Sequence, residues 1–198
     1  MHGLVNRSIQ CFIKDTYGDA AWADICQMAA LGFDSFESLL TYDASQTEAV
    51  LTAAGKKLLR SRAVLLEDMG TYLVSHPDLD PLRRLLRFGG ETFEEFLHSL
   101  DDLHDRARLA LPEMSFPRLE LREHSANSFS LYYRWGARGF GTLALGILRA
   151  MADDYGALVL LNHATGQDDL GDLDVISIEL LDAAHASGRE FDPAAGLR

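Results

Sequence analysis

The strongest constraint on the fold is a change of hydrophobic period at Pro112. Before this proline, apolar residues recur every three or four positions, as on the buried side of amphipathic helices. After it, short segments alternate between apolar and polar residues, which is typical of half-buried strands, and one further helical segment interrupts them. We therefore expect an α+β protein, with a helical N-terminal lobe followed by a small antiparallel sheet that one helix crosses.

These patterns place the individual elements. Helices are predicted at 19–31, 45–59, 62–74, 81–88, 91–111 and 139–155, and strands at 118–123, 128–135, 157–164 and 174–181. Ser45 and Glu48 have the spacing of a capping box at the start of one helix, and a Gly/Asp-rich loop is expected between the last two strands. We expect a single domain over 1–184, with a helical lobe at 1–60 and an α/β lobe at 61–184. A disordered tail is expected at 185–198.

Composition limits the partners and the compartment. The chain of 198 residues carries 18 Lys and Arg against 30 Asp and Glu, a formal net charge of −12. Nucleic-acid backbone and anionic membranes reward a basic surface, so neither is expected as a partner. No apolar run approaches the roughly 18 residues that span a bilayer, and the N-terminus lacks a signal peptide, which favours the cytoplasm. Cys11 and Cys26 are interpreted as small buried residues.

One histidine lies on the most regular apolar stripe of the sequence. In the segment 91–111, His104 follows Leu100 by four residues and precedes Ala107 by three, so its side chain should face the core. Two interpretations remain open from the residues alone. His104 is either a hydrogen-bonded core histidine or an iron ligand, because neutral imidazole binds iron through one ring nitrogen. Walker loops, nucleophile elbows and zinc-type Cys/His spacings are missing from the sequence, so it gives no sign of an enzyme.

Several separated motifs resemble the haem-nitric-oxide/oxygen-binding (H-NOX) family, which includes the haem domain of soluble guanylate cyclase and bacterial stand-alone sensors. The segment from Phe93 to Arg106, FEEFLHSLDDLHDR, is similar to the family's proximal helix. The start, MHGLVN, resembles the family's usual start, and Tyr17-Gly18 followed by Trp22 continues the match. Pro117 falls where the family carries a proline that presses on the haem. The resemblance runs from the first residue to about residue 181.

The resemblance implies a haem-based gas sensor rather than an enzyme. It implies a haem b between the two lobes, with His104 as the iron ligand and gases bound on the opposite face. The residues placed there by the resemblance are apolar: Leu4, Val5, Leu143 and Ile147. Such a pocket offers bound oxygen no hydrogen bond, so nitric oxide and carbon monoxide are the expected ligands. Nitric oxide weakens the bond opposite to it, and loss of the His104–iron bond would release the helix. The implied partner is a separate histidine kinase or cyclic-di-GMP enzyme.

The sequence departs from the family at the clamp that holds the haem propionates. The family uses a tyrosine, a serine and an arginine at alternate positions of one strand, where they share a face. Here Tyr133 matches the tyrosine, Trp135 and Ala137 replace the other two, and Arg138 comes one residue late.

Three outcomes remain open at this altered clamp. In the first, haem binds in a modified pose, held by Arg134 or by Arg138 re-aimed by a bulge at Gly136. In the second, haem binds loosely through His104 and apolar contacts, and in the third the site has left haem behind. The last outcome defines an alternative function, a haem-independent binding or adaptor module of the same fold. Some relatives also hold zinc through cysteines and a histidine. Here His163 lies in that region but Cys11 and Cys26 do not, so no zinc is expected.

Overall fold

The computed structural model describes residues 1–110, 112, 115–136 and 139–191. Its helices are α1 (Gly3–Tyr17), α2 (Asp19–Met28), α3 (Ala44–Leu58), α4 (Arg62–Ser75), the short 3-10 helix η1 (Pro77–Leu79), α5 (Asp80–Arg87), α6 (Phe93–Ser99), α7 (Leu103–Ala110) and α8 (Gly141–Tyr155). Its strands are β1 (Arg118–Ser125), β2 (Ser128–Arg134), β3 (Leu158–Asp168) and β4 (Gly171–Asp182). The chain divides into two compact units, Met1–Leu65 and Leu66–Arg198, which are described separately below. The predicted α+β class is confirmed.

The first unit contains α1, α2, α3 and the start of α4. Its core is apolar and aromatic, with Ile13, Trp22, Phe36 and Val50 at most 2% exposed. Buried polar contacts cross this core, among them the hydrogen bond that the Thr47 hydroxyl donates to Asn6 Oδ1 over 2.7 Å. A hydrogen bond between buried groups satisfies both and fixes the pairing of α1 with α3.

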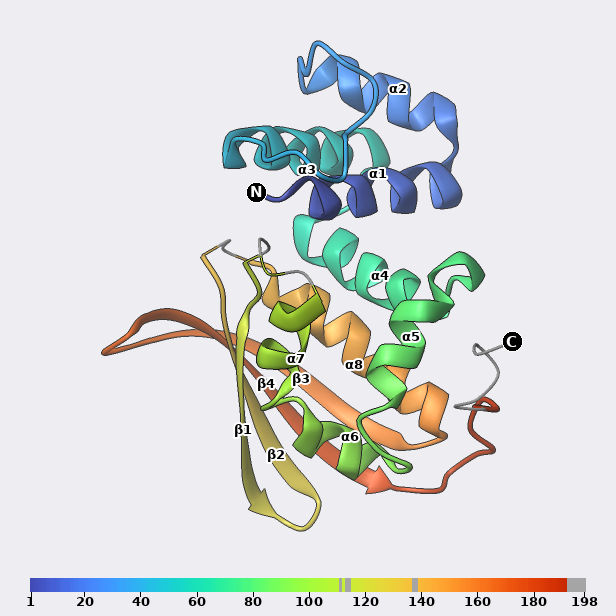
Figure 1. The fold of residues 1–198 in the computed structure, drawn as a ribbon, viewed down its shortest axis with the longest axis vertical. Coiled ribbons are helices and arrows are strands. Elements are labelled where there is room, and N and C mark those ends of the chain that lie inside the picture. The colour runs from blue at the N-terminus through green and yellow to red at the C-terminus, as the bar shows by residue number, and fades with distance from the viewer. Residues whose placement is uncertain (111, 113–114, 137–138, 192–198) are drawn as a thin grey trace. The chain divides into compact units, whose positions relative to one another are not determined.

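The second unit is built on a four-stranded antiparallel sheet in the order β1-β2-β4-β3. Helices α6 and α8 pack on one face of this sheet (Figure 1). The alternation seen in the sequence explains why, because every second residue of a strand points to the same face. The residues that meet the helices include Phe129 and Leu131 of β2 and Ile176 and Ile178 of β4, all at most 1% exposed.

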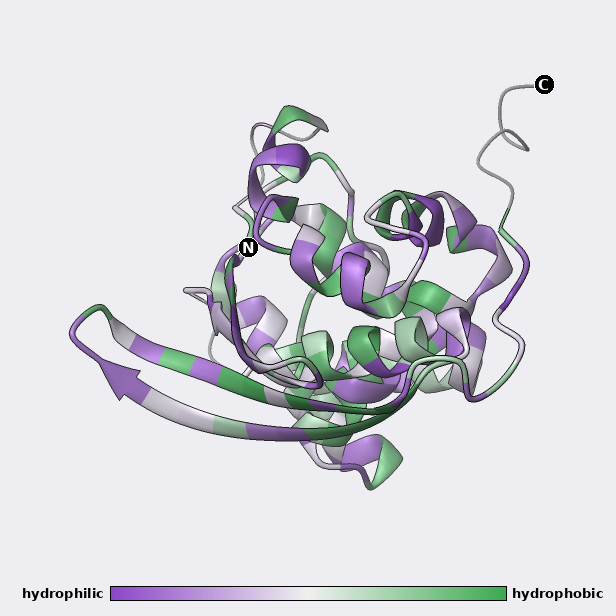
Figure 2. Cartoon of the chain, turned by 90° about the horizontal axis from the view of Figure 1, so that it is seen from below, coloured by the Kyte–Doolittle hydropathy of each residue, from purple (hydrophilic) through white to green (hydrophobic). Residues whose placement is uncertain are grey.

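The hairpin of β3 and β4 is longer than predicted. The two strands stay paired as far as Asp168 and Gly171, through the segment that the sequence analysis placed in a loop. Strand β2 accompanies β4 only up to the pair Tyr133 and Asp174, so the last part of the hairpin is a two-stranded ribbon. Figure 2 shows this ribbon extending from the sheet. Leu170, in the turn that joins β3 to β4, is 83% exposed.

Two local predictions were wrong. The helix predicted over 91–111 is two helices, α6 and α7, separated by a turn at residues 100–102. Asp101 in this turn accepts a hydrogen bond from the Leu121 amide of β1 over 2.7 Å, a tertiary contact that periodicity cannot reveal. The capping box expected at Ser45 is also wrong. Asp43 is the N-cap of α3, because its carboxylate accepts the Ser45 amide hydrogen.

Helices α4 and α8 approach each other at two glycines. A methyl group added at Gly146 would lie 2.0 Å from the Glu67 carbonyl oxygen, and one added at Gly70 would lie 2.2 Å from the Leu143 carbonyl oxygen. The two backbones are therefore in direct contact, which only residues without a side chain allow. This contact fixes α8, and with it Leu143 and Ile147, relative to α4.

The segment 186–191, which the sequence analysis assigned to the tail, lies along the end of α8. The amide of Ala186 donates to the Gly156 carbonyl over 3.0 Å, and the amide of Arg189 donates to the Asp154 carbonyl over 2.8 Å. Beneath it, Arg83 and Asp154 form a buried ion pair with a 2.7 Å contact. In the part of the chain that the structure describes, no helix is both long and apolar enough to cross a membrane.

Candidate functional site

His104 lies in the first turn of α7 and is half-buried. Its Nδ1 atom is 3.1 Å from the carbonyl oxygen of Pro117, the residue just before β1. A carbonyl oxygen can only accept, so Nδ1 carries the hydrogen and donates. In the neutral ring this leaves the lone pair on Nε2, for which no partner is found among the described residues. This is the arrangement of a histidine metal ligand, whose second nitrogen donates to a fixed acceptor.

The helix that carries His104 is tied to its surroundings on both sides. The Asp101–Leu121 hydrogen bond fixes the turn before α7 to β1. Arg106, two residues after His104, donates from Nη2 to the Ser99 carbonyl at the end of α6 over 3.0 Å. Leu103 packs against the core of the unit. Together these contacts hold the imidazole at a fixed place beside Pro117.

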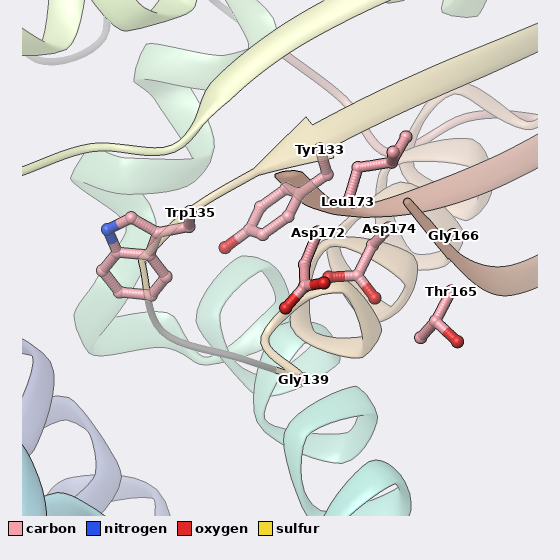
Figure 3. Close-up of a pocket in the computed structure, with 8 residues that line it drawn as sticks. All are labelled: Tyr133, Trp135, Gly139, Thr165, Gly166, Asp172, Leu173 and Asp174. Carbon is pink, nitrogen blue, oxygen red and sulfur yellow. The ribbon is translucent and has the colours of Figure 1, made fainter. Parts of the chain in front are cut away.

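A pocket of about 280 Å³ lies at the end of β2, where the sequence analysis placed the altered clamp. It is lined by Tyr133, Trp135, Gly139, Thr165, Gly166, Asp172, Leu173 and Asp174 (Figure 3). Tyr133 and Trp135 are thus brought together at one site, as expected. Ala137 and Arg138 lie outside the described residues.

Tyr133 is 4% exposed, yet its hydroxyl points toward the pocket in Figure 3. Its burial, together with the negative charge of Asp174, raises the pKa of the phenol far above its ordinary value. The hydroxyl therefore keeps its proton over the physiological range. No hydrogen-bond partner for it is found among the described residues, so it is available to donate to a ligand.

Trp135 lies just beyond the end of β2. Its ring makes an edge-to-face contact with Phe140, with 4.9 Å between the ring centres and an angle of 83° between the planes. Phe140 is fully buried. Trp135 is thus half-buried against the start of α8 and forms an apolar wall of the pocket. The serine that the family carries at this position would instead offer a hydroxyl.

Two pocket residues, Asp172 and Asp174, were missed by the sequence analysis. Asp174 shares the inner face of β4 with Ile176 and Ile178, and it is 8% exposed. Its Oδ1 atom lies 2.7 Å from His163 Nε2. An aspartate in register with apolar residues on a buried face is a detectable sequence signal, because a buried carboxylate needs a partner. The same reasoning would have drawn attention to His163.

The residues assigned to the gas-binding face are divided between the two units. Leu143 and Ile147 are half-buried and lie one turn apart on α8, while Thr142, next to them, donates its hydroxyl to the Gly139 carbonyl over 3.2 Å. Leu4 and Val5 belong to α1 in the first unit. The hydroxyl of Thr142 is thus already used in a hydrogen bond to the segment just before α8.

His104 fits the iron of a haem, whereas the pocket at Tyr133 fits the propionates only in part. His104 presents a free Nε2 from a fixed ring, and the Tyr133 hydroxyl is a donor suited to a carboxylate. The other described groups that line the clamp pocket include two carboxylates, Asp172 and Asp174, and no Lys or Arg. Negative side chains oppose an anionic ligand group, so the propionate end carries an electrostatic penalty that Tyr133 alone does not offset.

Comparison with known proteins agrees with the geometry. The curated relatives include the soluble guanylate cyclase gcy-31 of Caenorhabditis elegans, 25% identical over 154 residues, covering 78% of this chain and 22% of that protein. The soluble guanylate cyclase 89Db of Drosophila melanogaster is 23% identical over 155 residues, covering 78% of this chain and 23% of that protein. The chain thus spans about a quarter of the length of these relatives.

Solved structures show the same fold. An H-NOX mutant from K. algicida in the unliganded Fe(II) form has a TM-score of 0.77 and 20% identity, covering 92% of this chain and 97% of that one. A Cs H-NOX mutant carrying 4-cyano-L-phenylalanine also has a TM-score of 0.77, with 13% identity, covering 96% of this chain and 100% of that one. Residues 2–163 match the family described as Haem-NO-binding, and the chain belongs to that family.

Proposed function

We propose that this protein is a haem-based nitric oxide sensor in which His104 holds the iron through Nε2. The observation that carries the proposal is the hydrogen bond from His104 Nδ1 to the Pro117 carbonyl. It selects the tautomer that a metal ligand requires and fixes the ring. The haem, which we propose to be haem b, would supply the iron that binds nitric oxide or carbon monoxide.

The chain's own residues support a simple coupling from the ligand site to the fold. His104 lies in α7, and α7 is tied to β1 by the His104–Pro117 and Asp101–Leu121 hydrogen bonds. While Nε2 is bound, the imidazole holds α7 in one place. If Nε2 were released, α7 would keep these hydrogen bonds, the Arg106–Ser99 hydrogen bond and its packing through Leu103, but it would lose its attachment to the haem, so its position relative to β1 could change. Such an element has two arrangements that a ligand can bias.

Selectivity for nitric oxide and carbon monoxide over oxygen follows from the side chains of α8. Leu143 and Ile147 offer no hydrogen-bond donor, and the nearby Thr142 hydroxyl donates to Gly139. We propose that these two residues line the gas-binding face, and that a separate signalling enzyme, a histidine kinase or a cyclic-di-GMP enzyme, responds to the change in α7.

Titration with haemin tests the proposal. The haem-free wild-type protein and two variants, His104→Ala and His98→Ala, are titrated with haemin while the visible absorption spectrum is recorded. His98 is a matched control because it lies on α6, is about half exposed and contacts Glu123 over 3.8 Å. We expect one equivalent of haemin to bind to the wild type and to His98→Ala, with at least tenfold weaker binding to His104→Ala. Failure of the wild type to bind haemin would contradict the proposal.

The acidic lining of the clamp pocket favours a second candidate function, a haem-independent adaptor of the same fold. Asp172 and Asp174 oppose the carboxylates of a haem. In that case His104→Gly would leave the binding of the protein partner unchanged, whereas the first candidate predicts that it alters partner regulation by nitric oxide.

A further inference from the structure

We propose that the pocket at the end of β2 binds the cationic group of a small organic molecule, an ammonium or a guanidinium, rather than a carboxylate. The groups that would contact this cation are the carboxylates of Asp172 and Asp174, the hydroxyl of Tyr133 and the ring of Trp135. The inference goes beyond the proposed function and does not rest on it, because His104 is not among the described residues that line this pocket.

The register of the sheet brings the polar groups of the pocket to one face. Asp174 pairs with Tyr133 of β2 on one side and with Thr165 of β3 on the other, so the three side chains share a face. Asp172 lies two residues before Asp174 on β4, and alternate residues of a strand point to the same side. Two carboxylates and two hydroxyls therefore line the pocket from one face of the sheet (Figure 3).

The charge of the pocket selects the sign of its ligand. Asp172 and Asp174 are acidic, and none of the other lining residues that the structure describes is Lys or Arg. Asp174 is 8% exposed, so water screens its charge less than at an open surface, and attraction to a cation is correspondingly stronger. Its Oδ1 accepts a hydrogen bond from His163 Nε2 over 2.7 Å. A carboxylate has about four lone-pair sites, so this bond leaves Asp174 able to accept from a ligand.

Tyr133 provides an independent sign that the pocket takes a polar ligand. Its side chain is 4% exposed, and its hydroxyl points toward the pocket (Figure 3). Buried polar groups in folded proteins nearly always have a hydrogen-bond partner. In the part of the chain that the structure describes, this hydroxyl has none, so a ligand would supply it. A phenol oxygen accepts from an N–H group as readily as its hydrogen is donated.

The aromatic wall favours an organic cation over a metal ion. Trp135 is held by its edge-to-face contact with Phe140 and borders the pocket. The face of an indole ring attracts a cation within about 6 Å, and a guanidinium is weakly hydrated and stacks on such rings. A metal ion instead needs several ligands, and no group of three or more His, Cys, Asp or Glu among the described residues could hold one. With a volume of about 280 Å³ the pocket suits a small molecule.

The test follows the indole N–H signals of the full chain by NMR. The sequence contains two tryptophans, so Trp135 reports on the pocket and Trp22, in α2 of the first unit, is an internal reference. Ethylguanidinium chloride is the probe, ethylurea is its neutral counterpart of nearly the same shape, and magnesium chloride tests for a metal ion. Sodium chloride keeps the ionic strength constant, because salt screens the interactions between charges.

Three variants locate the binding. Tyr133→Phe removes only the hydroxyl, and Asp174→Asn removes the charge of a carboxylate at nearly constant shape. Glu179→Gln is the matched control, since this exposed carboxylate lies further along β4 and on its opposite face. The Trp22 signal and the spread of the other amide signals show whether each variant is folded.

We expect ethylguanidinium to shift the Trp135 signal to saturation and to leave the Trp22 signal unchanged, whereas ethylurea and magnesium produce no saturable shift. Tyr133→Phe and Asp174→Asn should each weaken binding about tenfold, as expected for the loss of one hydrogen bond to a charged group. Glu179→Gln should bind like the wild type. Absence of a saturable Trp135 shift with ethylguanidinium, equal binding of ethylurea, a saturable shift with magnesium, or wild-type affinity in Tyr133→Phe would overturn the inference. Each of these results would leave the role proposed for His104 standing.

Discussion

The ring of His104 is oriented by Pro117, whose carbonyl oxygen lies 3.1 Å from Nδ1. The two residues are thirteen positions apart and belong to α7 and to the approach to β1. The acceptor is a backbone atom, so its presence does not depend on the side chain at position 117. The contact therefore fixes the imidazole through the main chain and leaves Nε2 as the nitrogen that can bind a metal.

The turn before α7 provides the first prediction. Replacing Asp101 with alanine removes the acceptor of the Leu121 amide, and we expect the free energy of unfolding to fall by about 0.5–1.5 kcal/mol. Asp102→Ala is the matched control, since the neighbouring carboxylate is also exposed and accepts no hydrogen bond from β1 in the described residues. Urea unfolding measures both variants. Equal stability of the two variants would show that the contact does not hold α7.

The contact between α4 and α8 provides the second prediction. Gly146→Ala should destabilise the protein by about 1–3 kcal/mol, because the new methyl group would lie 2.0 Å from the Glu67 carbonyl oxygen and force the helices apart. Gly136→Ala is the control, since a methyl group there meets no atom within 4 Å. Thermal unfolding of the two variants checks this. A Gly146→Ala protein as stable as the wild type would contradict the close approach.

The buried ion pair of Arg83 and Asp154 provides the third prediction. Arg83→Met should lower the free energy of unfolding by about 1–3 kcal/mol, because the buried Asp154 carboxylate loses its hydrogen-bonded partner and keeps the longer contact with Arg87, 3.5 Å away. Arg149→Met, which removes the more exposed contact with Glu67, should cost at most about 1 kcal/mol. Arg83 also donates to the Glu190 carbonyl over 3.1 Å, so its loss should speed cleavage by trypsin after Arg189. Unchanged cleavage after Arg189 would show that Arg83 does not hold the segment 186–191 in place.

The ion pair between Arg134 and Asp168, the last residue of β3, provides a prediction on pH. Hydrogen bonds from Arg134 lower the pKa of the exposed Asp168 carboxyl. A lowered pKa in the folded state means that this contact contributes stability above the ordinary carboxyl range, and that the contribution is lost as the pH falls through the lowered value. Arg134→Gln should move the Asp168 pKa back toward the ordinary value of about 3.9, as measured by NMR titration. An unchanged pKa would show that Arg134 does not hold Asp168 in solution.

Much of the fold follows from hydrophobic period alone. The sequence predicts α8 and the hairpin of β1 and β2 within a few residues, because long periodic segments fix which face is buried. The break between α6 and α7 could not be predicted in this way. The apolar stripe continues through it, and the capping box of Thr92 and Glu95 marks only the start of α6. The ribbon of β3 and β4 was missed because glycines and aspartates usually indicate loops.

Part of the candidate functional site could also be predicted from the sequence. Periodicity and family resemblance together singled out His104, Pro117, Tyr133 and Trp135, and the last two line one pocket. The acceptor of the His104 ring is a main-chain carbonyl, which no side-chain pattern reveals. Asp174 and His163 come from neighbouring strands, and their contact depends on the register of β3 with β4. That register is set by the full length of the hairpin, which the sequence analysis underestimated.

The most direct test of the central claim, that His104 Nε2 is the iron ligand, is the visible absorption spectrum of the reduced, haem-loaded protein before and after addition of nitric oxide. The account predicts a Soret band in the wild type that shifts with nitric oxide. It also predicts a His104→Gly protein whose different initial spectrum returns to that of the wild type when imidazole is added, because free imidazole can take the place of the missing ring. Identical spectra for the wild type and His104→Gly, without imidazole, would contradict it.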